Sequence, residues 1–319
     1  MLHQETKSRW FPTLALITAL MTLGLIVFGA VVRVTDSGLG CGNTWPLCNG
    51  TIFPPLDNLT AWIEWLHRLF AALIGLFGLA TLALAIRAYR HHNRAVLTAT
   101  AVAAVLFVIQ SGLGALVVVL DLPPTMVTLH LGTAMLLLAA LQIAALFALY
   151  RPKISYPRDR FTSLGIVTTI LALVIILTGA LVRGSGATLA CIDWPLCNGE
   201  VLPFAQGQLA TIHMFHRFAV LALGVALVLL IWQAYAARSS RAIRILAAAS
   251  LAAYLMQAGI GAMYVIERAA PIWGASHVAF AAVTWGLLVA LSAIDLMNSR
   301  DKQGENASQW QPQSTPAAN

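Results

Sequence analysis

A carboxylate, an imidazole and a guanidinium lie together in the segment Glu64-Trp65-Leu66-His67-Arg68, just inside a long apolar run. Glu64 and His67 are three residues apart, so they share one face of a helix. Ionisable side chains within a membrane span are costly unless they face a protein interior, and there they mark functional sites. The segment therefore predicts a buried site with a metal-binding imidazole and a proton-exchanging carboxylate.

The chain contains an internal duplication. The pattern around His67 returns 149 residues later as His213-Met214-Phe215-His216-Arg217, with His213 in the place of Glu64. The sequence Trp-Pro-Leu-Cys-Asn-Gly occurs at 45–50 and again at 194–199. A shared offset over such different motifs indicates two related halves, each with its own copy of the histidine site.

The composition is that of a membrane protein. Of 319 residues, 59% are hydrophobic and only 10% are charged, which is too apolar for a soluble globular protein. A span needs about 20 apolar residues to cross about 30 Å of hydrocarbon. Eight stretches meet this requirement: 11–32, 63–86, 95–119, 126–149, 162–182, 210–234, 242–265 and 273–297. The predicted fold class is an all-α polytopic membrane protein with eight transmembrane helices.

Each half has four spans, an even number, so both halves enter the membrane in the same direction. This predicts two parallel four-helix repeats. The N-terminal half is 1–150 and the C-terminal half is 151–298. The tail, 299–319, is rich in Gln, Ser, Asn and Pro without an apolar period, which predicts disorder. The first span is expected to be retained, because its apolar run is too long for a signal peptide.

The distribution of charge predicts the orientation. The net charge is +7, and the cations gather in alternate connections such as 87–94 and 151–160. This positive-inside pattern places both termini in the cytoplasm and excludes a nucleic-acid partner. The opposite connections carry the cysteines and most acidic residues, so they are expected on the outer face of the cell (plasma) membrane.

Four histidines fall four to six residues from the outer ends of the second, fourth, sixth and eighth spans. They are His67, His130, His216 and His277. At 1.5 Å per residue all four lie at nearly one depth. Two histidines at one level on two helices match bis-imidazole haem ligation, whereas they make a poor zinc site. We therefore expect one haem per half, although a single such histidine is more often a hydrogen-bonded packing residue.

The two halves differ in one acid–base group. Glu64 aligns with His213, whose role the sequence leaves open. A buried glutamate beside a haem could shuttle protons or stabilise positive charge. The alternative is an ion pair with Arg68, four residues away on the same helix. The asymmetry predicts one reacting haem and one that moves electrons.

Other repeated polar residues lie near the same level. Arginines at the outer ends of spans could bind haem propionates or act as interface anchors. They are Arg33, Arg68, Arg183 and Arg217. Gln110 and Gln257 have glycine neighbours typical of close helix packing with a cross-helix hydrogen bond.

The four cysteines form two closely spaced pairs. Cys41 and Cys48 lie in the first outer loop, and Cys191 and Cys197 lie in the corresponding loop of the second half. Both spacings allow a small disulfide on an oxidising outer face. Neither is the Cys-x-x-Cys of a thioredoxin-like site, so a structural link is favoured over an electron relay.

Taken together, these motifs resemble those of heme A synthase. The resemblance covers nearly the whole chain and rests on the Glu64-x-x-His67-Arg68 segment, the two Trp-Pro-Leu-Cys loops, His130, the His216-Arg217 pair and His277. The paired loop cysteines look like the bacterial form of the family. The resemblance implies an oxidoreductase acting on a CH or CH2 group, which oxidises the C8 methyl of haem O to a formyl group through hydroxylated intermediates.

The resemblance also implies roles for the two halves. His67 and His130 would ligate the substrate haem O, with Glu64 as the essential catalytic carboxylate. His216 and His277 would be the axial ligands of a haem B cofactor. Heme O synthase would be a partner within the lipid bilayer, and formation of a homo-oligomer is left open.

Three other functions fit parts of the pattern. A diheme electron-transfer protein linked to quinol explains the four histidines but gives Glu64 no task. A disulfide oxidoreductase would use the outer cysteines with quinone. A transporter with parallel repeats offers no reason for four histidines at one depth.

Overall fold

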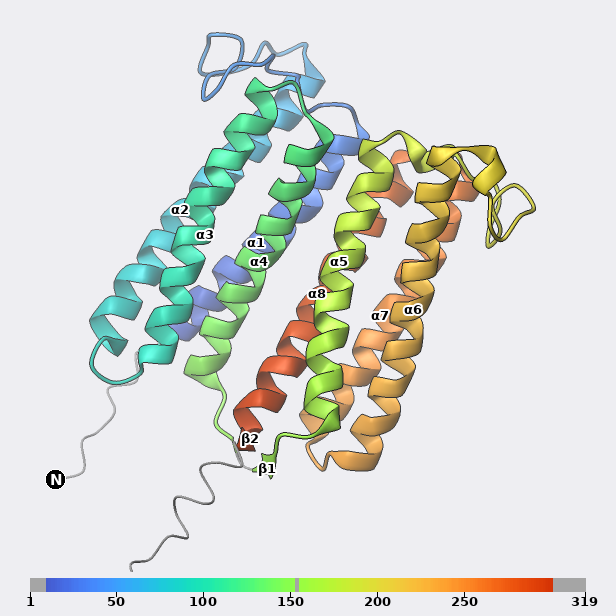
Figure 1. Ribbon diagram of the computed structural model, residues 1–319. Helices are drawn as coiled ribbons and strands as arrows, with labels where there is room; N and C mark the ends of the chain where they lie inside the picture. Colours follow the sequence, from blue (N-terminus) through green and yellow to red (C-terminus); the bar gives the residue numbers. More distant parts are fainter. Residues whose placement is uncertain (1–9, 153–154, 301–319) are drawn as a thin grey trace, which may run out of the picture.

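The computed structural model describes residues 10–152 and 155–300, which fold almost entirely into helices (Figure 1). Within these residues eight helices are long and apolar enough to cross a membrane. They are α1 (Trp10–Val34), α2 (Leu59–Tyr89), α3 (Arg94–Val119), α4 (Pro124–Leu149), α5 (Arg160–Gly184), α6 (Gln208–Ala237), α7 (Arg241–Ile266) and α8 (Pro271–Asn298). The predicted all-α, multi-pass membrane fold is confirmed. Each expected span lies within its helix.

Short elements complete the chain. The α5–α6 connection contains two 3-10 helices, η1 (Ala187–Leu189) and η2 (Phe204–Gln206). Two two-residue strands, β1 (Tyr156–Pro157) and β2 (Ser299–Arg300), pair in parallel. We call the end of the bundle with the α1–α2 and α5–α6 connections the loop end, and the end with β1 and β2 the linker end (Figure 1). Which end faces the cytoplasm stays a prediction from the charge pattern.

Helix starts follow local capping chemistry. The side chain of Asn58 accepts a hydrogen bond from the backbone N–H of Ala61 at 3.0 Å, which satisfies one free donor at the start of α2. Proline occupies the first position of α4 and of α8, where its missing N–H costs nothing. These starts place Glu64 and His67 within the first three turns of α2, close to the loop end.

The two halves pack in corresponding ways. α1 packs against α2 and α4, and α3 packs against α4; α5 packs against α6 and α8, and α7 packs against α8. The halves meet through α1, α4, α5 and α8, while α2, α3, α6 and α7 lie outside (Figure 1). The interface helices are therefore the buried core, and the outer helices form the lipid-facing wall.

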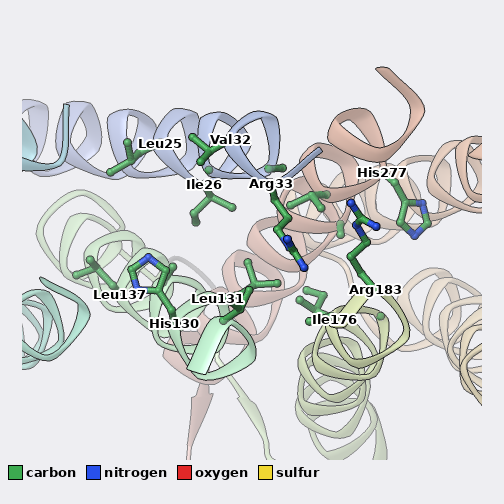
Figure 2. Close-up of a pocket in the computed structure, with 18 of the residues that line it drawn as sticks. Leu25, Ile26, Val32, Arg33, His130, Leu131, Leu137, Ile176, Arg183 and His277 are labelled. Atoms are coloured by element: carbon green, nitrogen blue, oxygen red, sulfur yellow. The ribbon is translucent and has the colours of Figure 1, made fainter. Parts of the chain in front are cut away.

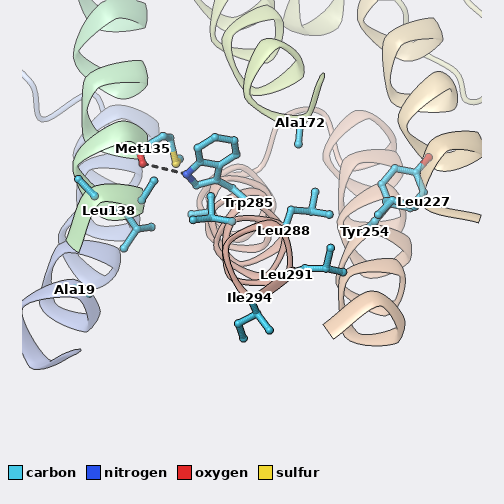
Figure 3. Packing of buried hydrophobic residues seen from close by; sticks show 14 of the residues in the cluster. Ala19, Met135, Leu138, Ala172, Leu227, Tyr254, Trp285, Leu288, Leu291 and Ile294 are labelled. Atoms are coloured by element: carbon cyan, nitrogen blue, oxygen red, sulfur yellow. Dashed lines mark hydrogen bonds between the residues drawn. The ribbon is translucent and has the colours of Figure 1, made fainter. Parts of the chain in front are cut away.

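Aromatic and aliphatic side chains of α8 fill this core. Trp285 reaches α4, where its indole N–H donates to the carbonyl of Met135 at 3.0 Å (Figure 3). Leu288 and Leu291 are fully buried beside it. An indole N–H that finds a partner in an apolar core avoids the cost of an unsatisfied buried donor. Trp285 thus joins the two halves by both packing and a hydrogen bond.

A buried ion cluster lies at the linker end. The guanidinium of Arg238 donates to Asp159 and to Asp295 at 2.7 Å each, and it stacks over the ring of Tyr156 at 4.1 Å. Ser299 and Arg300, the first two residues of the tail expected to be disordered, pair with β1. The rest of that tail, 301–319, lies outside the described residues. The cluster fastens the linker to α6 and α8.

Candidate functional site

A cavity of about 1360 Å³ extends through both halves and is lined by all four spanning histidines. This volume exceeds the roughly 300–1,000 Å³ of a pocket for one drug-sized ligand, so the cavity has room for more than one ligand of that size. Figure 2 shows Arg33 and Arg183 between His130 on one side and His277 on the other. The structure therefore brings the four predicted histidines and all four predicted arginines to one cavity.

Each histidine ring packs over a glycine of a neighbouring helix. A methyl group added to that glycine would approach Cε1 of the ring to 3.1 Å in three pairs and to 2.8 Å in the fourth. The pairs are Gly29 with His67, Gly114 with His130, Gly179 with His216, and Gly261 with His277. The missing side chain lets each ring lie against the adjacent backbone. Gly114 and Gly261 belong to the glycine-rich segments beside Gln110 and Gln257, but the sequence did not reveal their contact with histidine.

The ligand candidate His216 is held in a defined tautomer. The hydroxyl of Thr178 donates to the carbonyl of Ile175 at 2.8 Å, so its oxygen accepts the Nδ1–H of His216 at 2.9 Å. Nε2 of His216 is then the nitrogen left with a free lone pair. The corresponding neighbour of His67 is Phe28, which offers only a ring contact at 6.0 Å between centroids. The second half therefore has the more rigidly oriented imidazole.

Under the sequence-based prediction that His216 ligates a haem, we expect a Thr178→Val variant to hold that haem at least about tenfold more weakly, because ligand-orienting partners typically contribute that much to affinity. Valine preserves the shape and removes the acceptor oxygen. The measurement is haem B per chain after purification, followed by titration with haem B. Thr178→Ser should restore retention. Equal retention by the valine variant and the unmodified protein would contradict the role.

The remaining imidazoles have unpaired nitrogens. Among the described residues, Nδ1 of His67, His130 and His277 is buried without a hydrogen-bond partner. Nε2 of His130 lies 3.2 Å from the side-chain amide nitrogen of Gln110, the cross-helix contact expected from the glycine-rich packing. Binding of a haem iron by Nε2 of His130 would displace the side-chain amide of Gln110. Buried imidazoles with open nitrogens fit a haem group better than a purely structural role, since native interiors seldom leave such groups unsatisfied.

Glu64 lies at the junction of α2 and the cysteine loop. Its side chain is almost fully buried, it accepts a hydrogen bond from the backbone N–H of Cys41 at 2.9 Å, and it forms an ion pair with Arg68. The ion pair considered from the spacing is thus present. Because Glu64 also lines the cavity, the contact positions the carboxylate at the site.

The aligned residue His213 makes the corresponding connection in the other half. The carbonyl of Ala187 can only accept, so Nδ1 of His213 donates to it at 2.9 Å. Nε2 then accepts from the guanidinium of Arg217 at 3.3 Å. His213 is therefore a neutral imidazole that ties α6 to η1. Like Glu64 it contacts the preceding loop and the arginine four residues later, but it donates to a loop carbonyl where Glu64 accepts from a loop N–H, and it carries no negative charge.

The four predicted arginines divide into two kinds. Arg68 donates to the loop carbonyls of Thr44 and Leu47 at 2.9 and 3.0 Å, and Arg217 donates to those of Pro195 and Leu196. These two guanidiniums are occupied by their loops. Arg33 and Arg183 extend between the histidines instead (Figure 2).

Arg183 has a single carboxylate contact among the described residues, the exposed side chain of Asp36 at 3.7 Å, and its Nε is buried without a partner. Arg33 lies opposite it on the other half (Figure 2). Two cations facing one cavity with so little compensating charge favour an anionic ligand such as a carboxylate.

Both predicted disulfides are present. Cys41 is bonded to Cys48, and Cys191 is bonded to Cys197. All four cysteines are completely buried. Thiol–disulfide exchange requires access for the attacking thiolate, so burial favours a structural link over an electron relay.

Comparison with known proteins agrees with this site. The model of the family COX15-CtaA, described as cytochrome oxidase assembly protein, matches residues 12–289. The chain belongs to this family. The match spans all eight helices and both copies of the histidine site, so the COX15-CtaA assignment applies to the whole bundle.

Individual relatives support the COX15-CtaA assignment. The chain is 33% identical over 299 residues to a protein named heme A synthase from Symbiobacterium thermophilum, covering 89% of this chain and 94% of the relative. It is 32% identical over 289 residues to a heme A synthase from Exiguobacterium sp., covering 88% and 92%. A heme A synthase from Halalkalibacterium halodurans is 37% identical over 231 residues, covering 69% and 76%. The similarity is therefore of nearly full length.

Proposed function

We propose that this chain is a heme A synthase that oxidises the C8 methyl of haem O to the formyl group of haem A. The observation that carries the proposal is a duplicated site with one chemical difference. Two histidine pairs line one cavity, and Glu64 of the N-terminal half is the only carboxylate among the described residues of its wall. Conversion of a methyl group and a water molecule into a formyl group releases four protons and four electrons, so it needs a proton acceptor and an electron outlet to an external oxidant. The names of the relatives support the same reaction.

The residues of each half have distinct tasks under this proposal. His67 and His130 would hold haem O, and His216 and His277 would hold haem B, which supplies a one-electron redox centre when bound. Glu64 accepts protons from the carbon being oxidised. Its two hydrogen-bonded neighbours hold the carboxylate in the cavity wall.

Under this proposal, the propionates are bound by the two cavity-lining arginines that do not donate to the disulfide loops. Arg33 and Arg183, which extend between the histidines, would pair with haem carboxylates, while Arg68 and Arg217 hold the disulfide loops.

The setting follows from the substrate. Haem O is too apolar to diffuse freely through water, so it reaches this protein through the lipid bilayer, with heme O synthase as its source. The site lies near the loop end, which the charge pattern predicts to be the outer one. The bacterial sources of the relatives support a bacterial plasma membrane as the setting.

The test is the haem content of membranes from cells that make haem O, with and without this protein, by extraction and chromatography. Haem A is expected only when the protein is present. Unchanged haem O together with two bound haem B per chain would make the protein a diheme electron carrier and overturn the enzyme proposal.

A further inference from the structure

The cavity is deeper in one half than in the other. Along α2 its lining continues from His67 to Leu82, about 22 Å at 1.5 Å per residue. Along α6 it ends at Leu223, only about 10 Å beyond His216 by the same measure. We call the extra volume the apolar arm. Its walls include Leu76, Gly78, Leu79, Leu82, Ala104 and Val108.

Aligned positions explain why the second half lacks the arm. Gly78 aligns with Leu227, 149 residues later. A methyl group added to Gly78 meets nothing within 4 Å, whereas Leu227 is buried in the main core. The same helix level is therefore open space in the first half and filled by a leucine side chain in the second.

A second aligned pair closes the seam between the outer helices. Tyr254 of α7 donates its hydroxyl hydrogen to the carbonyl of Val220 on α6 at 2.9 Å, crossing over Gly224. The aligned residue in the first half is Phe107, which packs on Gly75 and has no hydroxyl to donate. α6 and α7 are therefore joined by a hydrogen bond that α2 and α3 cannot make at this level.

The arm is apolar and open to the side. Leu79 of α2 and Val108 of α3 both line it, and these residues are 64% and 71% exposed. The arm therefore reaches the lipid-facing surface between these helices. Its threonines do not make it polar, because the hydroxyls of Thr18, Thr22 and Thr100 each donate to a carbonyl of their own helix at 2.8 Å.

We infer that the apolar arm binds the isoprenoid side chain of the tetrapyrrole substrate, and that Leu227 and Tyr254 exclude such a chain from the second half. This inference rests on the proposed function. A farnesyl-derived chain distinguishes haem O and haem A from haem B, and its hydrocarbon matches a wall without free hydrogen-bonding groups. The lateral opening lets the chain move in from the bilayer while the macrocycle lies near the histidines.

The test uses Gly78→Leu, which copies the second half, with Gly78→Ala as its matched control. Full-length protein is purified from cells that make haem O and haem B, and each haem is counted per chain. We expect the leucine variant to lose at least tenfold in haem O content and to retain haem B. The alanine variant should retain both. Full haem O content in the leucine variant would overturn the inference.

A second measurement avoids mutation. Farnesol, added to the purified unmodified protein, should release bound haem O while haem B stays bound. Release of neither haem, or of both equally, would overturn the inference. Failure of the proposed function is a separate result, because unmodified protein would then contain no haem O and its membranes would form no haem A.

Discussion

Replacing Glu64 by glutamine is expected to reduce haem A formation at least about 100-fold, the contribution of a positioned proton acceptor. Glutamine keeps an oxygen that can accept the Cys41 N–H, so the loop stays attached to α2. It cannot accept a proton at neutral pH. The variant should therefore bind haem normally and accumulate haem O or hydroxylated haem in membranes.

The control for this prediction is Glu267→Gln, which changes an exposed glutamate at the end of α7. It should form haem A at the rate of the unmodified protein. A structural role for Glu64 makes a different prediction: glutamine would then be nearly silent, and only Glu64→Ala would reduce activity, together with haem content. Extraction of haems from the four proteins distinguishes the two roles.

Removing Arg238 is expected to lower stability by about 3–5 kcal/mol, the usual cost of leaving a buried charge without its partner. In Arg238→Ala the carboxylate of Asp295, whose side chain is 2% exposed, keeps only hydroxyl partners, from Tyr156 and Thr162. The measurement is the midpoint of thermal unfolding in detergent. Arg241→Ala removes an exposed cation at the start of α7 and should leave the midpoint unchanged.

The same cluster predicts an acid response. Hydrogen bonds from Arg238 hold the pKa of Asp159 below its usual value. A lowered folded-state pKa means that this stabilisation is complete above the unfolded-state pKa of about 3.9 and is lost as pH falls through the folded value. The unmodified protein should therefore lose stability below about pH 4. Arg238→Ala should show a smaller acid effect, and an identical pH profile would contradict the assignment.

Much of this protein was determined by its sequence alone. The eight spans are set by the length of apolar runs, because each run must cross the same thickness of hydrocarbon. The duplication is visible because its two copies share residues at a nearly constant offset. Local spacing was sufficient for both disulfides, since each closes a short loop. The difference between Glu64 and its aligned residue His213 could also be read from the sequence without coordinates.

Tertiary structure decided what depends on contacts between distant segments. Spacing placed four arginines at span ends, but only the tertiary structure shows that Arg68 donates to loop carbonyls while Arg33 extends between the histidines. The ion cluster joins Arg238 to residues 79 and 57 positions away, which no local pattern reveals. The depth of the cavity depends on whether Gly78 and Leu227 meet empty or filled space. These properties depend on tertiary packing, because the neighbours of a residue decide whether its side chain is buried or adjoins a cavity.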